Sequence, residues 1–542
     1  FRHDGLSRNR LPDPPCSFEK RRPKRLSFLA PTGAAVFFPP SFPLSQKSLM
    51  KNFTLTTLSI VFWVNLLVAA PLTIALDGAP KSLDPRFAVD ANGMRLTQVL
   101  LFETLVQQDD SLRIVPGLAE SWTHPDDTTW ILKLKAGVHF QDGSQLDAED
   151  VRFTFEHIMD PETKSPFQFL SKKLKSVEAT GDRTVTFHLF QPEAAFFLDI
   201  FIPIFSRNSD LENAKLIGTG PYQLVSQDPN GISLKRFDDY HGTKPTIEEL
   251  ELKIIQDANT RFLKMRKGEI DLAINVVPLD KLPQFERGSL ATEYKMMTGP
   301  ALNYQYLGLN MKSSKLQDPR VRRAIAHGIN RQELIEFLKK GRAVAADSVL
   351  TKQNDFSAPG LVSYQHDPQK ARQLLKEAGI ENLTLEYKTS NSRDAVQQAR
   401  ILQNQLKEIG INLEIRSFEW GTFFGDVKAG NFELFSLRWV GVSEPDFYYS
   451  LFHSSELPDV GGRNRVRYSN AEIDSLLEQG RSTIDPQERK KYYNKVQEIL
   501  QLDLPYISLW HNQNVALVKE NIDGFRLHPS GGFQSLVYIS RR

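Results

Sequence analysis

The segment Leu118–Pro161, LAESWTHPDDTTWILKLKAGVHFQDGSQLDAEDVRFTFEHIMDP, contains the local signals for strands, a turn and a helix in one run. In Thr129–Lys135 the side chains alternate between two faces, which is typical of a half-buried strand. Asp142-Gly143 is a turn signal, and Asp147 fits the N-cap of a helix with Asp150 at its third position. The helix would carry one apolar stripe, formed by Val151, Phe155, Ile158 and Met159.

A different pattern in the C-terminal half predicts parallel strands. Leu383–Lys388 and Asn412–Phe418 have strand composition, and the helical stretch Arg393–Ile409 between them ends at Gly410. A strand-helix-strand unit of this kind has a right-handed crossover and parallel strands. The fold class is therefore expected to be mixed α/β, with an α+β first half.

Two further elements bear on the function. Met94–Leu105 is expected to form a helix, and Phe432–Arg438 a strand that delivers Trp439 to a loop at its end.

The bulk properties favour a soluble protein of several lobes. The 542 residues are too many for one compact core, and 40% hydrophobic with 24% charged residues is ordinary for a globular chain. The formal net charge of +2 is uneven, because residues 1–49 carry +6 while everything from Pro71 onward carries −5. A mildly acidic body gives no reason to expect a nucleic-acid partner.

The segment Met50–Ala70 has the layout of a secretory signal. Lys51 supplies the positive end, Leu55–Ala70 is apolar, and Val68-Ala69-Ala70 offers small residues for cleavage. The alternative is a membrane anchor. Residues 1–49, which hold the single cysteine, Cys16, are interpreted as a non-native or disordered extension, so no disulfide is expected in the body.

Several ordered motifs resemble one known family. They are the opening segment, Gly218–Tyr222 (GTGPY), Gly268–Asp271 (GEID), Asp318–Arg331 (DPRVRRAIAHGINR), Asp367–Gly379 (DPQKARQLLKEAG) and the block from Trp420 to Trp439. In this order they resemble landmarks of the family 5 extracellular solute-binding proteins, the periplasmic receptors of peptide-type ABC importers.

The resemblance implies a large, class C type, two-lobed periplasmic-binding-protein fold with an extra α+β subdomain on lobe I. The boundaries it implies are a signal at 50–70, lobe I at 71–95, 206–300 and 512–542, the subdomain at 96–205, and lobe II at 301–511.

Motifs for catalysis were sought and are absent from the sequence. There is no G-x-S-x-G elbow, no H-E-x-x-H and no P-loop, and Gly218–Gln223 lacks the third glycine of a dinucleotide fingerprint. We therefore expect no enzyme activity, no catalytic or metal-binding residues and no cofactor.

The resemblance also indicates two walls of a ligand cleft. One is the loop Val89–Gly93, with Asp90 and Asn92, whose backbone could pair with an extended ligand. The other is the segment from Trp420 to Asp446. Its candidate contacts are Trp420, Trp439, Val440, Val442, Glu444 and Asp446. Each tryptophan could instead simply pack lobe II.

One position departs from the family pattern. Peptide-binding members commonly show W-x-x-D here, with the Asp pairing with the peptide's α-ammonium, whereas this chain has Val442. A buried ammonium without a partner would cost several kcal/mol. Either Glu444, Asp446 or Asp90 takes over, or the ligand has no free amino terminus.

The resemblance implies a periplasmic, monomeric receptor that binds a peptide between its lobes and delivers it to a membrane permease served by separate ATPase subunits. Alternative cargoes are oligosaccharides, metal chelates and opine-like compounds. The rival classes are a secreted hydrolase and a membrane-tethered structural or chaperone-like protein.

Overall fold

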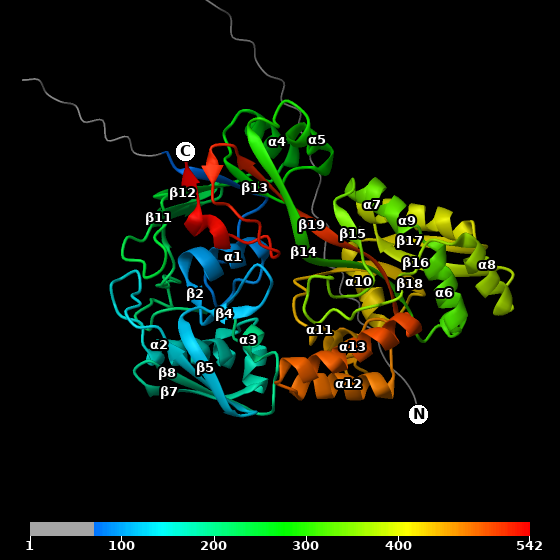
Figure 1. The fold of residues 1–542 in the computed structure, drawn as a ribbon, viewed down its shortest axis with the longest axis horizontal. Coiled ribbons are helices and arrows are strands. Elements are labelled where there is room, and N and C mark those ends of the chain that lie inside the picture. The colour runs from blue at the N-terminus through cyan, green and yellow to red at the C-terminus, as the bar shows by residue number, and fades with distance from the viewer. Residues whose placement is uncertain (1–69) are drawn as a thin grey trace, which may run out of the picture. The chain divides into compact units, whose positions relative to one another are not determined.

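The computed structural model describes residues 70–542, which form a mixed α/β fold as the sequence predicts (Figure 1). The expected extension 1–49 and the expected signal lie outside the described residues, apart from Ala70. No helix between residues 70 and 542 has both the length and the apolar character needed to cross a bilayer.

One large sheet runs through both lobes. Its strand order is β10 (Tyr222–Asp228), β11 (Gly231–Arg236), β12 (Glu249–Ile254), β1 (Leu72–Leu76), β13 (Leu272–Ile274), β19 (Tyr506–Lys519), β14 (Tyr294–Leu309), β18 (Leu434–Val440), β16 (Leu383–Ser390) and β17 (Ile411–Phe418). The short strand β15 (Ala343–Ala345) pairs with β19. The strands β10 to β13 belong to lobe I, and β16 to β18 belong to lobe II.

The long strands β14 and β19 join the lobes (Figure 1). They pair antiparallel from Tyr294 opposite Lys519 to Gly308 opposite Tyr506, with register shifts between Pro300 and Tyr304 and again after Gln305. Among the strands of residues 70–542, β19 and β14 alone lie between β13 and β18 in this sheet, so they are the physical link between the lobes.

The opening segment of the sequence folds as predicted. A four-stranded antiparallel sheet has the order β5 (Ala119–Asp126), β6 (Thr129–Leu134), β8 (Thr184–Leu189) and β7 (Leu174–Gly181). Helix α2 (Ala148–Met159) packs on this sheet, and Asp147 and Asp150 form a reciprocal capping box at its start. Together with the short α3 (Phe196–Asp199), these elements build the α+β subdomain on lobe I.

The remaining helices cover the sheet and connect its strands. In lobe I they are α1 (Ala91–Leu96), α4 (Ala258–Arg266) and α5 (Pro283–Glu286), and in lobe II α6 (Pro319–Gly328), α7 (Arg331–Lys339), α8 (Pro368–Glu377), α9 (Arg393–Lys407), α10 (Trp420–Ala429), α11 (Phe447–Phe452), α12 (Ala471–Ser482) and α13 (Pro486–Asp503). The predicted β16-α9-β17 unit is present, and β16 and β17 are parallel.

Each lobe buries its own hydrophobic core. One cluster combines Leu72 and Leu252 of lobe I with Phe155 and Phe187 of the subdomain, and a smaller cluster lies around α4 and α5. Two separate clusters fill lobe II. The exact residue boundaries of the lobes stay predictions.

Two expected elements differ in the structure. The helix expected at Met94–Leu105 ends as α-helix at Leu96, because the chain widens into a π-turn over Thr97–Leu101 and then enters the short strand Glu103–Thr104. Strand β18 continues through Trp439 to Val440, so Trp439 lies within the strand and not in the loop after it.

Removing the cap of α2 should destabilise the subdomain. In Asp147→Ala the N–H groups of Glu149 and Asp150 lose their acceptor, so we expect the free energy of unfolding to fall by about 1–2 kcal/mol. Asp147→Asn is the matched control, because it keeps a capping oxygen while removing the charge that faces Arg207. Thermal denaturation should rank the alanine variant below the asparagine variant, and equal melting temperatures for the two would contradict the role of the cap.

Candidate binding site

Two adjoining cavities lie between the lobes. The cleft cavity, about 990 Å³, is lined by the lobe I segment 278–280 and by side chains of α7, α9, α10 and β18 in lobe II. The hinge cavity, about 260 Å³, is lined by β13, by Asn303 of β14 and by residues 512–517 of β19. Leu279, Lys339 and Arg438 line both cavities, so the two volumes meet at these side chains.

Strand β18 forms one wall of the cleft cavity, because every second side chain of the strand lies on the same face. Ser436, Arg438 and Val440 share the face that lines the cavity. Trp439 lies on the opposite face and is buried, and its ring stacks parallel to that of Tyr306 with centroids 6.2 Å apart. Trp439 therefore packs in the core of lobe II and does not line either cavity.

Side-chain amides hold this wall in place. The Ser436 hydroxyl donates to the Tyr306 carbonyl at 2.7 Å and accepts from Gln398 at 2.7 Å and Gln305 at 2.9 Å. Because Gln398 is on α9 and Gln305 on β14, the network fixes a helix to two neighbouring strands. Sequence reasoning did not identify these residues, since nothing local indicates that they converge.

Exposed apolar side chains gather in the cleft cavity. Trp420, the first residue of α10, is 52% exposed and stacks on Phe424 with centroids 5.5 Å apart and planes 8° apart. Phe337 and Val440, both more than half exposed, line the same cavity. An apolar surface of this kind inside a cavity is suited to contact a ligand.

The cleft cavity also carries an excess of positive charge, because its four basic side chains outnumber its two carboxylates, Asp280 and Asp394. Its basic side chains are Lys339, Lys340, Arg393 and Arg438. Among the ion pairs between described residues, none involves these four side chains. Burial lowers the pKa of Lys339 and the nearby positive charge of Arg438 lowers it further, while Asp394, which also lines the cavity, opposes both effects. Two cations that face each other in this way would both be stabilised by a bound anion.

The loop after β18 holds the other predicted contacts. The Val442 side chain is buried, and its N–H donates to the Leu302 carbonyl at 3.0 Å. Asp446 accepts two hydrogen bonds from Arg481, at 3.0 and 2.7 Å, and one from Tyr493 at 3.3 Å. Its carboxylate therefore already has a cationic partner, the partly buried Arg481.

Glu444 is also paired. Its carboxylate lies 2.5 Å from the Arg489 guanidinium and also accepts a hydrogen bond from the Asp446 N–H. Burial raises the pKa of Glu444 above its ordinary value, while Arg489 opposes the rise. Glu444, like Asp446, is therefore already paired with an arginine. A second cation could bind to the carboxylate only by leaving that arginine without its counter-charge, which is unfavourable.

The predicted contacts in lobe I serve the start of α1. Asp90 is the N-cap, and it accepts from the N–H groups of Gly93 at 3.0 Å and Lys81 at 2.9 Å. Asn92 is buried and donates to the Gly78 carbonyl at 2.9 Å. Neither side chain lines the cleft or hinge cavity.

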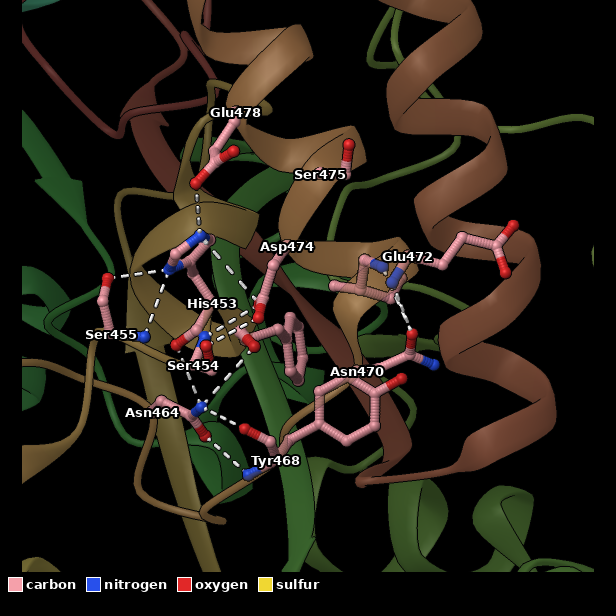
Figure 2. A network of polar contacts seen from close by, with 12 residues as sticks. His453, Ser454, Ser455, Asn464, Tyr468, Asn470, Glu472, Asp474, Ser475 and Glu478 are labelled. Carbon is pink, nitrogen blue, oxygen red and sulfur yellow. Dashed lines mark hydrogen bonds and ion pairs between the residues drawn. The ribbon is translucent and has the colours of Figure 1, made fainter.

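Figure 2 shows a network of polar contacts around His453. His453 Nδ1 lies 2.7 Å from the Ser455 hydroxyl, and His453 Nε2 lies 3.4 Å from Glu478 and 4.0 Å from Asp474. Asp474 accepts two hydrogen bonds from Ser454, through its N–H at 2.9 Å and its hydroxyl at 2.6 Å. These contacts tie the chain after α11 to α12, and neither interlobe cavity opens on them. Within residues 70–542, no group of three or more His, Cys, Asp or Glu side chains is arranged to hold a metal ion.

Two lobes joined by a pair of long strands, with a cavity lined from both sides, define a two-lobed binding protein. The model of the bacterial extracellular solute-binding proteins, family 5 Middle, matches residues 113–458, and the chain belongs to this family. The resemblance inferred from the sequence motifs is thereby confirmed.

Individual relatives cover almost the whole described chain. A dipeptide-binding protein of Escherichia coli is 26% identical over 505 residues, which are 85% of this chain and 93% of that protein. The structure of HbpA2 from Haemophilus parasuis has a TM-score of 0.80 at 25% identity, covering 87% of this chain and 100% of its own. The oligopeptide-binding protein AppA from Bacillus subtilis, in complex with a nonapeptide, has a TM-score of 0.69 at 26% identity, covering 87% and 99%.

The buried His511 of β19 should make stability depend on pH. Burial lowers the pKa of His511 to about 4, while the Ser348 carbonyl, 3.0 Å from Nε2, partly offsets the effect. The unfolded chain takes up a proton below about pH 6.5, and the folded chain does so only near pH 4. Stability is therefore lost as the pH falls through this window, by roughly 3 kcal/mol in total.

The variant His511→Gln should lose this part of the pH dependence. The raised pKa of Glu444 acts in the opposite direction, since the folded state then gains stability on acidification, and it acts equally in both proteins. The difference in melting temperature between wild type and variant should hence shrink from pH 7 to pH 4.5. A constant difference would show that His511 does not titrate as the structure indicates.

Proposed function

We propose that this protein is the periplasmic receptor of an ABC importer, which binds a peptide or a related small solute between its lobes and passes it to a membrane permease. The observation that carries the proposal is the cleft cavity, because its walls come from both lobes and it adjoins the strands that join them. Family membership supports the same function.

Lobe closure would provide the mechanism. A ligand shifts the balance between open and closed forms only if it contacts both lobes. Leu279 of lobe I and Arg438 of lobe II both line the cleft and hinge cavities, so one ligand can reach both. The closed form would then be presented to the permease, and separate ATPase subunits would supply the energy. We infer that the protein acts as a monomer and performs no chemistry on its cargo.

The charge of the cleft bears on the cargo. Four basic side chains stand against two carboxylates in the cavity, Asp394 and Asp280, and Asp280 is already paired with Lys281. In a chain that is acidic from Pro71 onward, this local excess of positive charge favours a solute with an anionic group such as the carboxylate of a peptide. The peptides named for the relatives from Escherichia coli and Bacillus subtilis agree with this cargo. Another acidic solute would satisfy the same cations, and it is the alternative to a peptide.

Isothermal titration against di- to pentapeptides should detect micromolar binding by at least some members, which corresponds to about −8.2 kcal/mol. Mass spectrometry of solutes that remain bound to natively purified protein would identify the cargo directly. If none of the peptides binds and another class of solute does, the peptide assignment is wrong and the receptor role is retained.

Neutralising Arg438 should weaken the binding of an anionic cargo. We expect Arg438→Gln to raise the Kd at least tenfold, because the variant removes one of the two cations at the junction of the cavities. Arg400→Gln, on the same lobe at an exposed position of α9, is the matched control and should bind normally. Equal affinities for both variants and the wild type would exclude an anion site at Arg438.

N-terminal sequencing of the exported protein would test the location. A mature start at or near Ala70 or Pro71 is expected for a periplasmic receptor, whereas retention of Leu55–Leu76 would favour a membrane tether.

A further inference from the structure

A third cavity lies between the subdomain and lobe II. The subdomain cavity, about 450 Å³, has walls formed by Trp122, Trp130 and Phe197 of the subdomain and by Phe356 and Pro445 of lobe II. Its volume falls within the range of small-ligand sites, and its lining is largely apolar.

Aromatic rings line the subdomain side of this cavity. Phe197 contacts Trp122 with centroids 4.8 Å apart and Trp130 with centroids 4.9 Å apart. His124 lies 4.9 Å from Trp130. Trp122 and Phe197 are only partly buried, so part of each ring is not covered by other protein atoms and faces the cavity.

The charged groups of the cavity neutralise one another. Glu444 pairs with Arg489 at 2.5 Å, and Arg113 pairs with Asp109 at 2.7 Å. Asp355 is the remaining charged side chain of the lining, and it is exposed. An occupant therefore meets apolar surface and ion pairs that are already formed, which favours a neutral apolar group.

The turn between α12 and α13 closes this region against the subdomain. The Ala194 N–H donates to the Arg481 carbonyl at 2.9 Å, and Ile484 packs against the core of lobe I and its subdomain. Ile484 also lines the cavity. The cavity is consequently complete only when lobe II and the subdomain are in contact.

The cleft cavity and the subdomain cavity lie close together. Val440 lines the cleft cavity and Ser443 lines the subdomain cavity, and three residues of extended chain span at most about 10 Å. At this segment the two cavities are therefore separated by no more than the length of a tripeptide.

We propose that the subdomain cavity is a pocket for an aromatic or large aliphatic side chain of the cargo, so that the subdomain selects for such a residue. The role of the pocket in selecting the cargo rests on the proposed receptor function, but binding in the pocket can be tested independently of that function. Because its walls come from the subdomain and lobe II, an occupant would also favour lobe closure.

The direct test uses a probe that is not a peptide cargo. N-acetyl-phenylalanine amide and N-acetyl-alanine amide are titrated into the wild-type protein, and the intrinsic tryptophan fluorescence is followed. The aromatic amide should bind at least tenfold more tightly, since it removes a phenyl ring from water and the alanine amide does not. No preference for the aromatic amide would overturn the proposal.

Two phenylalanine variants of the subdomain localise the effect. Phe197→Ala should abolish the preference, whereas Phe190→Ala should retain it, because Phe190 is 60% exposed and does not line the cavity. Circular dichroism and thermal denaturation verify that both variants fold. If Phe197→Ala keeps the full preference, the pocket lies elsewhere and the inference fails.

A peptide pair separates this inference from the proposed function. Tripeptides with and without one phenylalanine are titrated into the same three proteins. Tighter binding of the phenylalanine peptide, lost in Phe197→Ala, supports both the receptor function and the pocket. Binding of the aromatic amide with no binding of either peptide would refute the peptide cargo and leave the pocket standing. Equal binding of the two peptides would refute the role of the pocket in selection.

Discussion

The antiparallel pairing of β14 with β19 is the constraint on which the arrangement of the two lobes depends. The two strands are much longer than their neighbours and pass from one side of the large sheet to the other. Their register is interrupted between Pro300 and Tyr304, where residues 301–303 have no partner on β19. Pro300 cannot donate to the ladder in any case, because it has no N–H. Asn303, within this interruption, lines the hinge cavity, so the interruption lies next to the candidate site.

The packing of these two strands explains how the lobes can be separate bodies. The lobe I ends, with Tyr294 and Leu517, pack in the cluster around α4 and α5. The lobe II ends, with Leu309 and Ile507, pack in a different cluster. No single core spans the interruption, and Ile484 of the turn between α12 and α13 is the contact noted above between lobe II and the cluster of lobe I and its subdomain. A change of angle between the lobes would therefore leave the interior of each core intact. This is the arrangement that hinge bending requires.

The parts of the fold that the sequence predicts well are those set by local chemistry. The cap at Asp147, the strand Thr129–Leu134 and the β16-α9-β17 unit depend on neighbours a few residues away, and all three are present. The π-turn at Thr97–Leu101 has no such local signal, and the helix expected there is shorter for that reason. Leu100 and Leu101 within this turn are both buried, so the turn lies in the tertiary core, where local sequence signals do not reach.

The candidate site could be predicted only in part, for a related reason. In β18, alternation places Arg438 and Val440 on one face of the strand and Trp439 on the other. The expected strand ends at Arg438, so the alternation could not be extended to Trp439 and Val440. The pairing of Asp446 with Arg481 joins positions 35 residues apart, and no spacing in the sequence indicates it. The side chains of this segment that face the cavity could therefore be assigned only from the three-dimensional arrangement.

The ion pairs of the loop after β18 restrict what this loop can do. Breaking a buried pair by withdrawing one partner typically costs about 3–5 kcal/mol, because the other charge is left uncompensated. A ligand ammonium that took Asp446 from Arg481 would incur this cost before gaining anything, and the same holds for Glu444 and Arg489. The two carboxylates are therefore structural charges that fix the loop to α12 and α13. With Val442 also buried, the loop presents a rigid wall with no free negative charge to the cargo.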